Sequence, residues 1–210
     1  IYERFSQVED TPRFVEKVLR GRIAGKDVLD LGCGTGKYLG LLAEHANNYF
    51  GLDISKDQLY HAQKKAKDNT ILINSPAQRI PLPNDSIDTI ISCWVFGTID
   101  GNERKKQALN EALRVLKPNG EIYFVENDVG GDFEYVRGRF PEIERTKNYN
   151  DWLEEQGFTP HVRYDSYFEF DSVTEAKTVF GQIWGNSAKS KIESNIIGHK
   201  IVVYKMVKKD

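Results

Sequence analysis

The 210-residue sequence lacks several features that mark particular classes of protein. No apolar run approaches the roughly 18 residues that a membrane helix needs, and no charged-then-apolar leader opens the chain, so we expect neither a membrane segment nor a cleaved leader. Only two cysteines are present, Cys33 and Cys93, and neither their spacing nor their context indicates metal ligation. These absences lead us to expect a reduced, cytoplasmic protein that binds no metal.

An excess of positive charge is also missing. The formal net charge is −2 and the sequence pI is about 6.2. Because no global basic field is present, we do not expect nucleic acid as the substrate. With 40% hydrophobic and 29% charged residues, the chain is long enough for one substantial α/β domain with small appendages, but not for two full domains. We therefore expect a single domain over residues 1–210, whose oligomeric state the composition does not indicate.

The most informative stretch is an apolar run that ends in an acid and three alternate glycines, Val28-Leu29-Asp30-Leu31-Gly32-Cys33-Gly34-Thr35-Gly36. It predicts a strand that runs into a ligand-binding turn, because glycines adopt positive φ and let the backbone approach a bound molecule closely. The P-loop pattern G-x-x-x-x-G-K-[ST] fails at Leu31 and at Tyr38. The dinucleotide pattern G-x-G-x-x-G fails in both possible registers, at Lys37 and at Leu39.

Two acids narrow the class of ligand. A carboxylate at Asp30 would repel a pyrophosphate but would hold an ammonium group, so we do not expect a phosphate ligand. The second acid, Asp53, ends the next predicted strand about 20 residues after the first glycine, as in a mononucleotide-binding β-α-β half. Taken alone, Asp53 is also compatible with a helix N-cap beside Ser55.

These two motifs resemble those of the class I S-adenosylmethionine-dependent methyltransferases. In that family the acid-and-glycine turn cups the methionine part of the cofactor, and the second acid holds both ribose hydroxyls. The resemblance therefore implies S-adenosylmethionine as the cofactor and S-adenosylhomocysteine as the product. It implies a cofactor site made of Asp30, Gly32, Cys33, Gly34, Gly36, Asp53, Ile54, Ala77, Gln78 and Cys93.

The segment that would read the adenine departs from the family pattern. Residues 75–88 resemble the family's passage D-A-E-x-L-P-F-P-D-x-S-F-D, but Pro76 stands at the position of the first acid and Gln78 at that of the glutamate. The adenine amino group must therefore be met differently. The backbone of Ala77 and the side chain of Gln78 are the candidates.

From Asp27 onward, predicted strands and helices alternate, which indicates a parallel sheet with helices on both faces. The resemblance implies a Rossmann-like, doubly wound α/β fold whose mostly parallel, seven-stranded sheet has an antiparallel last strand. Residues 1–22 are expected to form an N-terminal lid of two helical pieces, with Thr11 as the cap and Pro12 as the first residue of the second piece. An irregular insertion on the acceptor side is expected at about residues 127–150.

The acceptor is expected near aromatic side chains. Trp94 and Phe96 follow the predicted strand 87–93, and ligands of open α/β sheets lie at the carboxyl ends of strands; the alternative is that both rings are core. The insertion adds further candidates, Tyr135, Arg137 and Arg139. Together these residues indicate a pocket with aromatic walls and a cationic rim, suited to a small molecule, although the arginines are equally compatible with a solvated surface.

The resemblance implies transfer of the methyl group of S-adenosylmethionine to an oxygen, nitrogen or carbon atom of a small molecule. The donor is already activated by its charge, so the enzyme mainly aligns the acceptor and, for weak nucleophiles, removes a proton. No catalytic residue is therefore assigned; Glu126, Asp128 and His161 are possible bases. The sequence has no N-P-P-[YF] tetrad and no Pro-Cys pair, which disfavours methylation of DNA bases and of many RNA bases.

Two other functions stay open. The protein could be a non-catalytic S-adenosylmethionine-binding partner or regulatory subunit, since the adenine-reading acid is replaced at Pro76 and no base is evident. An NAD-dependent oxidoreductase is disfavoured by Lys37 and Leu39.

Overall fold

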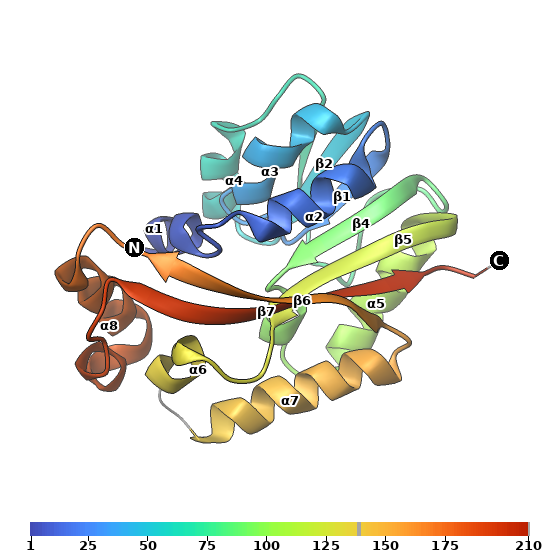
Figure 1. Ribbon diagram of the computed structural model, residues 1–210. Helices are drawn as coiled ribbons and strands as arrows, with labels where there is room; N and C mark the ends of the chain where they lie inside the picture. Colours follow the sequence, from blue (N-terminus) through green and yellow to red (C-terminus); the bar gives the residue numbers. More distant parts are fainter. Residues whose placement is uncertain (138–139, 210) are drawn as a thin grey trace. The chain divides into compact units, whose positions relative to one another are not determined.

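The computed structural model describes residues 1–137 and 140–209, without the side chains of residues 140–143. Its seven strands form one sheet in the order β3-β2-β1-β4-β5-β7-β6 (Figure 1). The sheet is mostly parallel with an antiparallel last strand, so the expected Rossmann-like α/β fold is confirmed. The strands are β1 Asp27–Leu31, β2 Asn48–Asp53, β3 Thr70–Asn74, β4 Ile87–Cys93, β5 Leu116–Asn127, β6 Thr159–Glu169 and β7 Ile196–Val207.

Helices alternate with the strands and surround the sheet (Figure 1). They are α1 Tyr2–Val8, α2 Phe14–Ile23, α3 Lys37–Leu42, α4 Lys56–Gln63, α5 Asn102–Val115, α6 Asp132–Arg137, α7 Phe140–Glu155 and α8 Val173–Ser190. The chain divides into two compact units. We call Val15–Glu126 together with the end of the chain from Tyr204 the glycine-turn unit, and Ile1–Phe14 together with Asn127–Val203 the aromatic unit.

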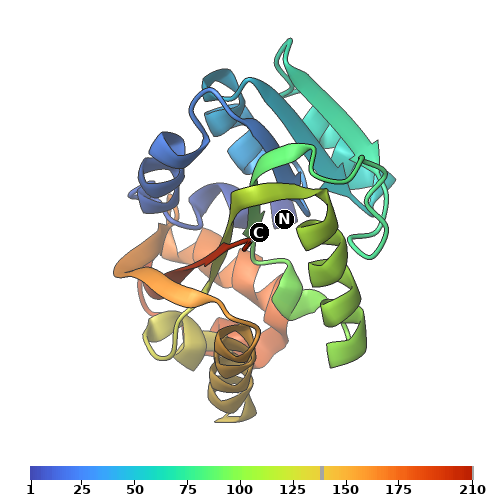
Figure 2. The same cartoon turned by 90° about the vertical axis from the view of Figure 1, so that its right-hand side faces the viewer.

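In the glycine-turn unit, β1 lies between two parallel neighbours. Asp30 is paired in register with Gly51 of β2 and with Ile91 of β4. Figure 2 shows β1, β2 and β3 side by side. Val28 and Leu29 have no exposed surface, as expected of a strand that is covered on both faces. The carboxyl ends of these strands therefore meet at one edge of the sheet, where ligands of open α/β sheets bind.

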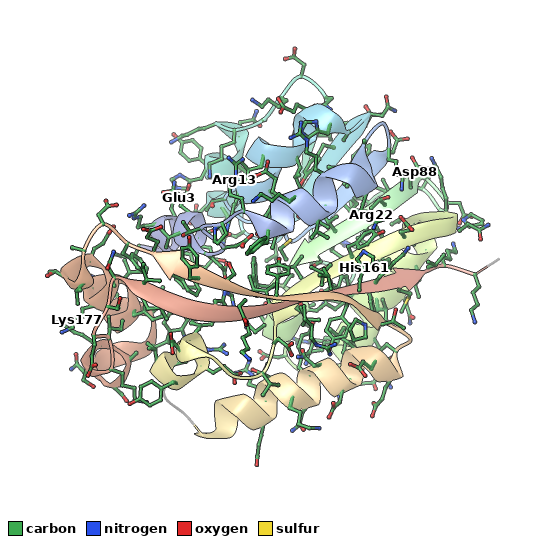
Figure 3. All side chains as sticks on the ribbon, in the orientation of Figure 1. Glu3, Arg13, Arg22, Asp88, His161 and Lys177 are labelled. Atoms are coloured by element: carbon green, nitrogen blue, oxygen red, sulfur yellow. The ribbon has the colours of Figure 1, made fainter. Side chains whose placement is uncertain are left out.

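Ion pairs lie at the opposite end of these strands, where β1, β4 and β5 begin. Asp88 lies at the start of β4 (Figure 3). It accepts hydrogen bonds from the backbone N–H of Asp27 at 2.9 Å and from Lys117 Nζ at 2.7 Å. Partial burial is the largest single influence on Asp88 and raises its pKa. The hydrogen bonds from Lys117 and from the N–H of Asp27, together with the charges of Lys117 and Lys26, outweigh burial, so the pKa lies below its usual value. These charges stabilise the start of three strands and leave the carboxyl edge for ligands.

The aromatic unit is built around stacked rings. Phe168 of β6 lies 5.0 Å from Phe5 of α1 and 4.9 Å from Phe133 of α6, measured between ring centroids. Phe180 of α8 completes the cluster with an edge contact to Phe168 at 5.6 Å. Both α1 and α6 lie against α8 (Figure 1). Aromatic pairs at these spacings contribute beyond the area they bury, so this cluster unites the N-terminal helix with residues far along the chain.

Two sequence-based predictions were wrong, one on where the second N-terminal helix begins and one on the conformation of the insertion. The second N-terminal helix begins at Phe14 and not at Pro12, because Arg13 has a left-handed φ of 58° that a helix cannot include. Thr11 instead accepts a hydrogen bond from the backbone N–H of Glu169 at 3.1 Å. The insertion predicted as irregular is largely helical, since α6 and α7 occupy most of it.

The N-cap of α8 gives a test of local stability. The side chain of Ser172 accepts a hydrogen bond from the backbone N–H of Glu175 at 3.1 Å. Ser172→Ala should therefore lower the free energy of unfolding in urea by about 1 kcal/mol. The control is Gln182→Ala, an exposed position inside α8 and before the break in that helix at Gly185, where we expect no loss. Equal losses for the two variants would contradict the assignment of the cap.

Candidate functional site

The turn after β1 is shaped by glycines in left-handed conformations. Gly32, Gly34 and Gly36 have φ values of 85°, 56° and 79°, which residues with a Cβ adopt only at a cost. A Cβ on Gly32 would lie 2.3 Å from a methyl group of Val95. The backbone N–H groups of Gly32 and Cys33 donate to the carbonyl of Leu52 at 2.7 and 3.0 Å, so the turn is tied to β2.

Asp30 lies at the end of β1 and is almost completely buried. Its Oδ2 atom accepts a 2.9 Å hydrogen bond from the hydroxyl of Tyr49 in β2. Burial raises the pKa of Asp30 to about 7, the hydrogen bond from Tyr49 lowers it, and the negative charge of Asp53 raises it. A buried acid of this kind favours a cationic ligand group.

Asp53 ends β2 and connects the two sequence motifs. Its Oδ2 atom accepts a hydrogen bond from the backbone N–H of Gly34 at 2.9 Å, and its Oδ1 atom accepts one from the N–H of Ser55 at 2.8 Å. Ser55 is the N-cap of α4, as its side chain accepts from the N–H of Gln58. Asp53 itself is therefore not the cap, and its carboxylate holds the glycine turn in place.

The remaining candidates near the turn differ in exposure. Cys33 is buried, and burial followed by the charges of Asp30 and Asp53 raises the pKa of its thiol, which stays protonated. Cys93 is half-buried at the end of β4. Ile54 is 71% exposed, and its carbonyl accepts a hydrogen bond from the side chain of Asn74 at 2.9 Å.

Side chains of α5 hydrogen-bond the backbone of the candidate adenine segment, residues 75–88. Arg114 donates to the carbonyls of Leu82 and Ile80 at 2.9 and 2.7 Å. Glu111 accepts from the N–H of Ile80 at 2.8 Å and pairs with Arg114 at 2.7 Å. Ala77 and Gln78 are half-buried within this held segment, where Gln78 makes a long 3.5 Å hydrogen bond to Arg104.

The aromatic candidates after β4 take two different positions. Trp94 has a left-handed φ of 55°, is half-buried, and its ring stacks with Tyr38 at 6.4 Å between centroids. Lys37 Nζ lies 5.2 Å from the centroid of Tyr38 and 5.8 Å from that of Trp94. Phe96 has no exposed surface and packs on Phe124 at 4.3 Å, so it is a core residue in this structure and any effect on an acceptor would be indirect.

The two candidates that the structure describes in the aromatic unit, Tyr135 and Arg137, do not form a cationic rim. Arg137 is mostly buried, lies over the ring of Phe133 at 4.4 Å and pairs with the buried Glu134 at 3.5 Å. Tyr135 is 65% exposed, and Lys191 Nζ lies over its ring. Arg139 lies outside the described residues. The charge of Arg137 is therefore balanced within its own helix and is not presented to an acceptor.

The three possible bases, Glu126, Asp128 and His161, differ in burial and in their interactions. Asp128 pairs with Arg163 Nε at 3.0 Å and Glu126 is buried. His161 is exposed on β6 (Figure 3). Within residues 1–137 and 140–209, no group of three His, Cys, Asp or Glu side chains is arranged to hold a metal ion. None of the described helices is long and apolar enough to cross a membrane.

Sequence reasoning did not single out Tyr49, Glu111 or Arg114. Tyr49 had a readable signal, because residues two apart in a strand share a face and Tyr49, Gly51 and Asp53 follow this period. A tyrosine in an apolar strand beside an acid needs a hydrogen-bond acceptor when buried. The clamp of Arg114 joins segments about 30 residues apart and had no local signal.

Residues 29–124 match a family model described as a methyltransferase domain. An uncharacterized protein of Methanocaldococcus jannaschii is 35% identical over 138 residues, which cover 60% of this chain and 51% of that protein. A tRNA (carboxymethyluridine(34)-5-O)-methyltransferase of Arabidopsis thaliana is 25% identical over 176 residues, 83% of this chain and 41% of that protein. A malonyl-[acyl-carrier protein] O-methyltransferase of Marinomonas sp. is 31% identical over 138 residues, 59% and 48% respectively. The chain thus spans about half the length of these curated relatives.

Solved structures resemble the chain over most of its length. The YcgJ protein of Bacillus subtilis gives a TM-score of 0.68 at 14% identity, covering 93% of this chain and 98% of that one. The N-methyltransferase NodS of Bradyrhizobium japonicum, in complex with S-adenosyl-L-homocysteine, gives 0.64 at 11% identity, covering 97% and 88%. At these identities the likeness concerns the fold.

Gly32 offers a test of the turn. Gly32→Ala should lower the free energy of unfolding by at least about 2 kcal/mol, because the new Cβ adds a left-handed strain and an overlap with Val95. The control is Gly21→Ala in α2, where a Cβ meets nothing within 4 Å. That variant should gain about 0.5–1 kcal/mol, since alanine favours a helix. Urea unfolding measures both, and an unchanged Gly32→Ala variant would contradict this geometry.

Proposed function

We propose that the chain is a class I S-adenosylmethionine-dependent methyltransferase, which binds S-adenosylmethionine and transfers its methyl group to an acceptor. The match of residues 29–124 to a methyltransferase domain supports this proposal. The observation that carries the proposal is the connected pair of acids at the carboxyl ends of β1 and β2. Asp30 is buried there, and Asp53 is hydrogen-bonded to the N–H of Gly34 in the glycine turn.

The residues present suit this cofactor. Asp30 is a buried carboxylate with one oxygen engaged by Tyr49, which suits the ammonium group of the methionine part. A carboxylate has about four acceptor positions, and the two amides bonded to Asp53 leave others for the ribose hydroxyls. The glycines place backbone against the ligand without a Cβ.

The cofactor would supply a methyl group activated by the positive charge of its sulfur. The chain's own task is then to bind the methionine part through Asp30, to hold the ribose through Asp53 and to align the acceptor. Ala77 and Gln78 are the proposed contacts of the adenine, on a segment that Arg114 keeps in position.

Binding is tested by calorimetry with S-adenosylhomocysteine, for which we expect measurable affinity. Asp53→Asn should weaken binding by about 1–3 kcal/mol, roughly 5- to 150-fold, because charge-assisted hydrogen bonds to the ribose are lost. The control is Asp57→Asn, an exposed acid in the first turn of α4, which should bind like the unchanged protein. No detectable heat at millimolar ligand would refute the proposal.

We further propose that the acceptor is a small molecule, methylated at oxygen, nitrogen or carbon. The net charge of −2 supports this proposal, because the chain has no global basic field for nucleic acid. The named relatives differ in acceptor, one acting on tRNA and another on malonyl-[acyl-carrier protein]. Both therefore belong in the test as competing acceptors.

Transfer of a labelled methyl group should be followed in three parallel reactions, with small metabolites below about 1 kDa, with total tRNA and with acyl-carrier protein. We expect labelled product in the first reaction, and product only in the second or third would overturn the small-molecule assignment.

Replacement of the adenine-reading acid by Pro76 also favours a second candidate, a cofactor-binding regulatory subunit. Binding of S-adenosylhomocysteine without product in any reaction would favour that candidate, and any turnover would exclude it.

A further inference from the structure

Tyr49 is a fully buried side chain in the middle of the cofactor half of the sheet. Its hydroxyl donates a 2.9 Å hydrogen bond to Asp30 Oδ2. Gly51, which follows on the same face of β2, is paired in register with Asp30, and a Cβ there would lie 2.9 Å from Leu72 and 3.1 Å from the sulfur of Cys33. The glycine therefore keeps this crowded face of β2 open beside the two hydrogen-bonded side chains.

The two oxygens of Asp30 have different surroundings. Oδ2 is engaged by Tyr49, whereas Oδ1 has no hydrogen-bond partner among the residues that the structure describes. The ionisable groups that act on this pair are Asp53 from β2, Cys33 from the turn and, through Tyr49, Cys93 from the end of β4. All of them are acids, so the hydroxyl of Tyr49 is the group that favours the charged form of Asp30.

We propose that Tyr49 is a positioning residue for Asp30: its hydroxyl holds Oδ2, leaves Oδ1 for the ammonium group of the cofactor and keeps the carboxylate charged when that group binds. This inference rests on the proposed function, because it assigns a role within the same cofactor site. Tyr49 itself does not touch the cofactor and acts through Asp30.

The role of Tyr49 predicts a particular dependence on pH. Burial raises the pKa of Asp30 to about 7, and the Tyr49 hydrogen bond opposes that rise. Without the hydroxyl the charged form loses its donor, so the pKa rises further and a larger fraction of Asp30 is protonated at neutral pH. A protonated acid cannot pair with an ammonium group, and affinity is lost first at the acidic end of the range.

The test is the affinity of Tyr49→Phe for S-adenosylhomocysteine, measured by calorimetry between pH 5.5 and 8.5 and divided by that of the unchanged protein at each pH. The protonation of the ligand's own amine cancels in this ratio. We expect a loss of about tenfold or more at pH 6 that shrinks to within about threefold at pH 8.5. The midpoint of the loss should move upward by about one to two pH units, the effect of a hydrogen bond to a charged group.

Three controls separate this role from a structural one. Tyr123→Phe removes another tyrosine hydroxyl that donates to a carboxylate, Glu121 at 3.0 Å, and should leave the ratio near one at every pH. Methylthioadenosine, which lacks the amino-acid part, should bind Tyr49→Phe and the unchanged protein with the same pH dependence. Asp30→Asn should bind S-adenosylhomocysteine weakly and without the acidic loss.

A loss that is equal at all pH values would overturn the proposal, since Tyr49 would then act through packing alone. If Tyr49→Phe does not fold, Asp30→Asn decides: an unchanged acidic loss in that variant would show that another group titrates. Failure of the unchanged protein to bind S-adenosylhomocysteine would instead refute the proposed function, so the two failures are distinguishable.

Discussion

The burial of a carboxyl group at the end of β1 is the constraint on which the cofactor site depends. Asp30 has a pKa of about 7 against an ordinary value near 3.8, so its charged form costs the fold on the order of 4 kcal/mol. Because the folded pKa is raised, the stability that Asp30 contributes is complete below about pH 4 and is lost as the pH rises through 7. The proposed contact with the ammonium group of the cofactor would offset this cost, because a cationic group restores a favourable interaction for the charged carboxylate.

The rest of the candidate site keeps a second acid, Asp53, close to Asp30. The carboxylate of Asp53 accepts a 2.9 Å hydrogen bond from the backbone N–H of Gly34 in the turn. The turn is also bonded to β2, because the N–H groups of Gly32 and Cys33 both donate to the carbonyl of Leu52. Ser55 caps α4, which leaves the carboxylate of Asp53 to the turn and the ligand. At the opposite edge, Lys117 and Asp88 are paired with each other. The charges at the starts of the strands thus pair with each other, whereas the two acids at the carboxyl ends are the proposed ligand contacts.

The sequence predicts the sheet and the glycine turn because both depend on local patterns. The bounds of β4 agree with the predicted strand 87–93, and the three glycines of the motif all have positive φ angles. The start of α2 was missed because the left-handed backbone of Arg13 is not encoded by its residue type. The pairing of Arg137 with Glu134 was also missed. Residues three apart face each other only on a helix, and the sequence analysis did not predict a helix there.

The candidate acceptor residues of the insertion lie in a different part of the chain from the candidate cofactor residues. All ten candidate cofactor residues lie between Asp30 and Cys93, inside the matched residues 29–124 and inside the glycine-turn unit. The candidates of the insertion lie outside that match, in the aromatic unit, where rings contributed by α1, α6, β6 and α8 form the core. Relatives that share the matched part carry names with different acceptors. Among the described residues of the insertion, Arg137 lies over the ring of Phe133 and pairs with Glu134, so its charge is balanced beside this aromatic core.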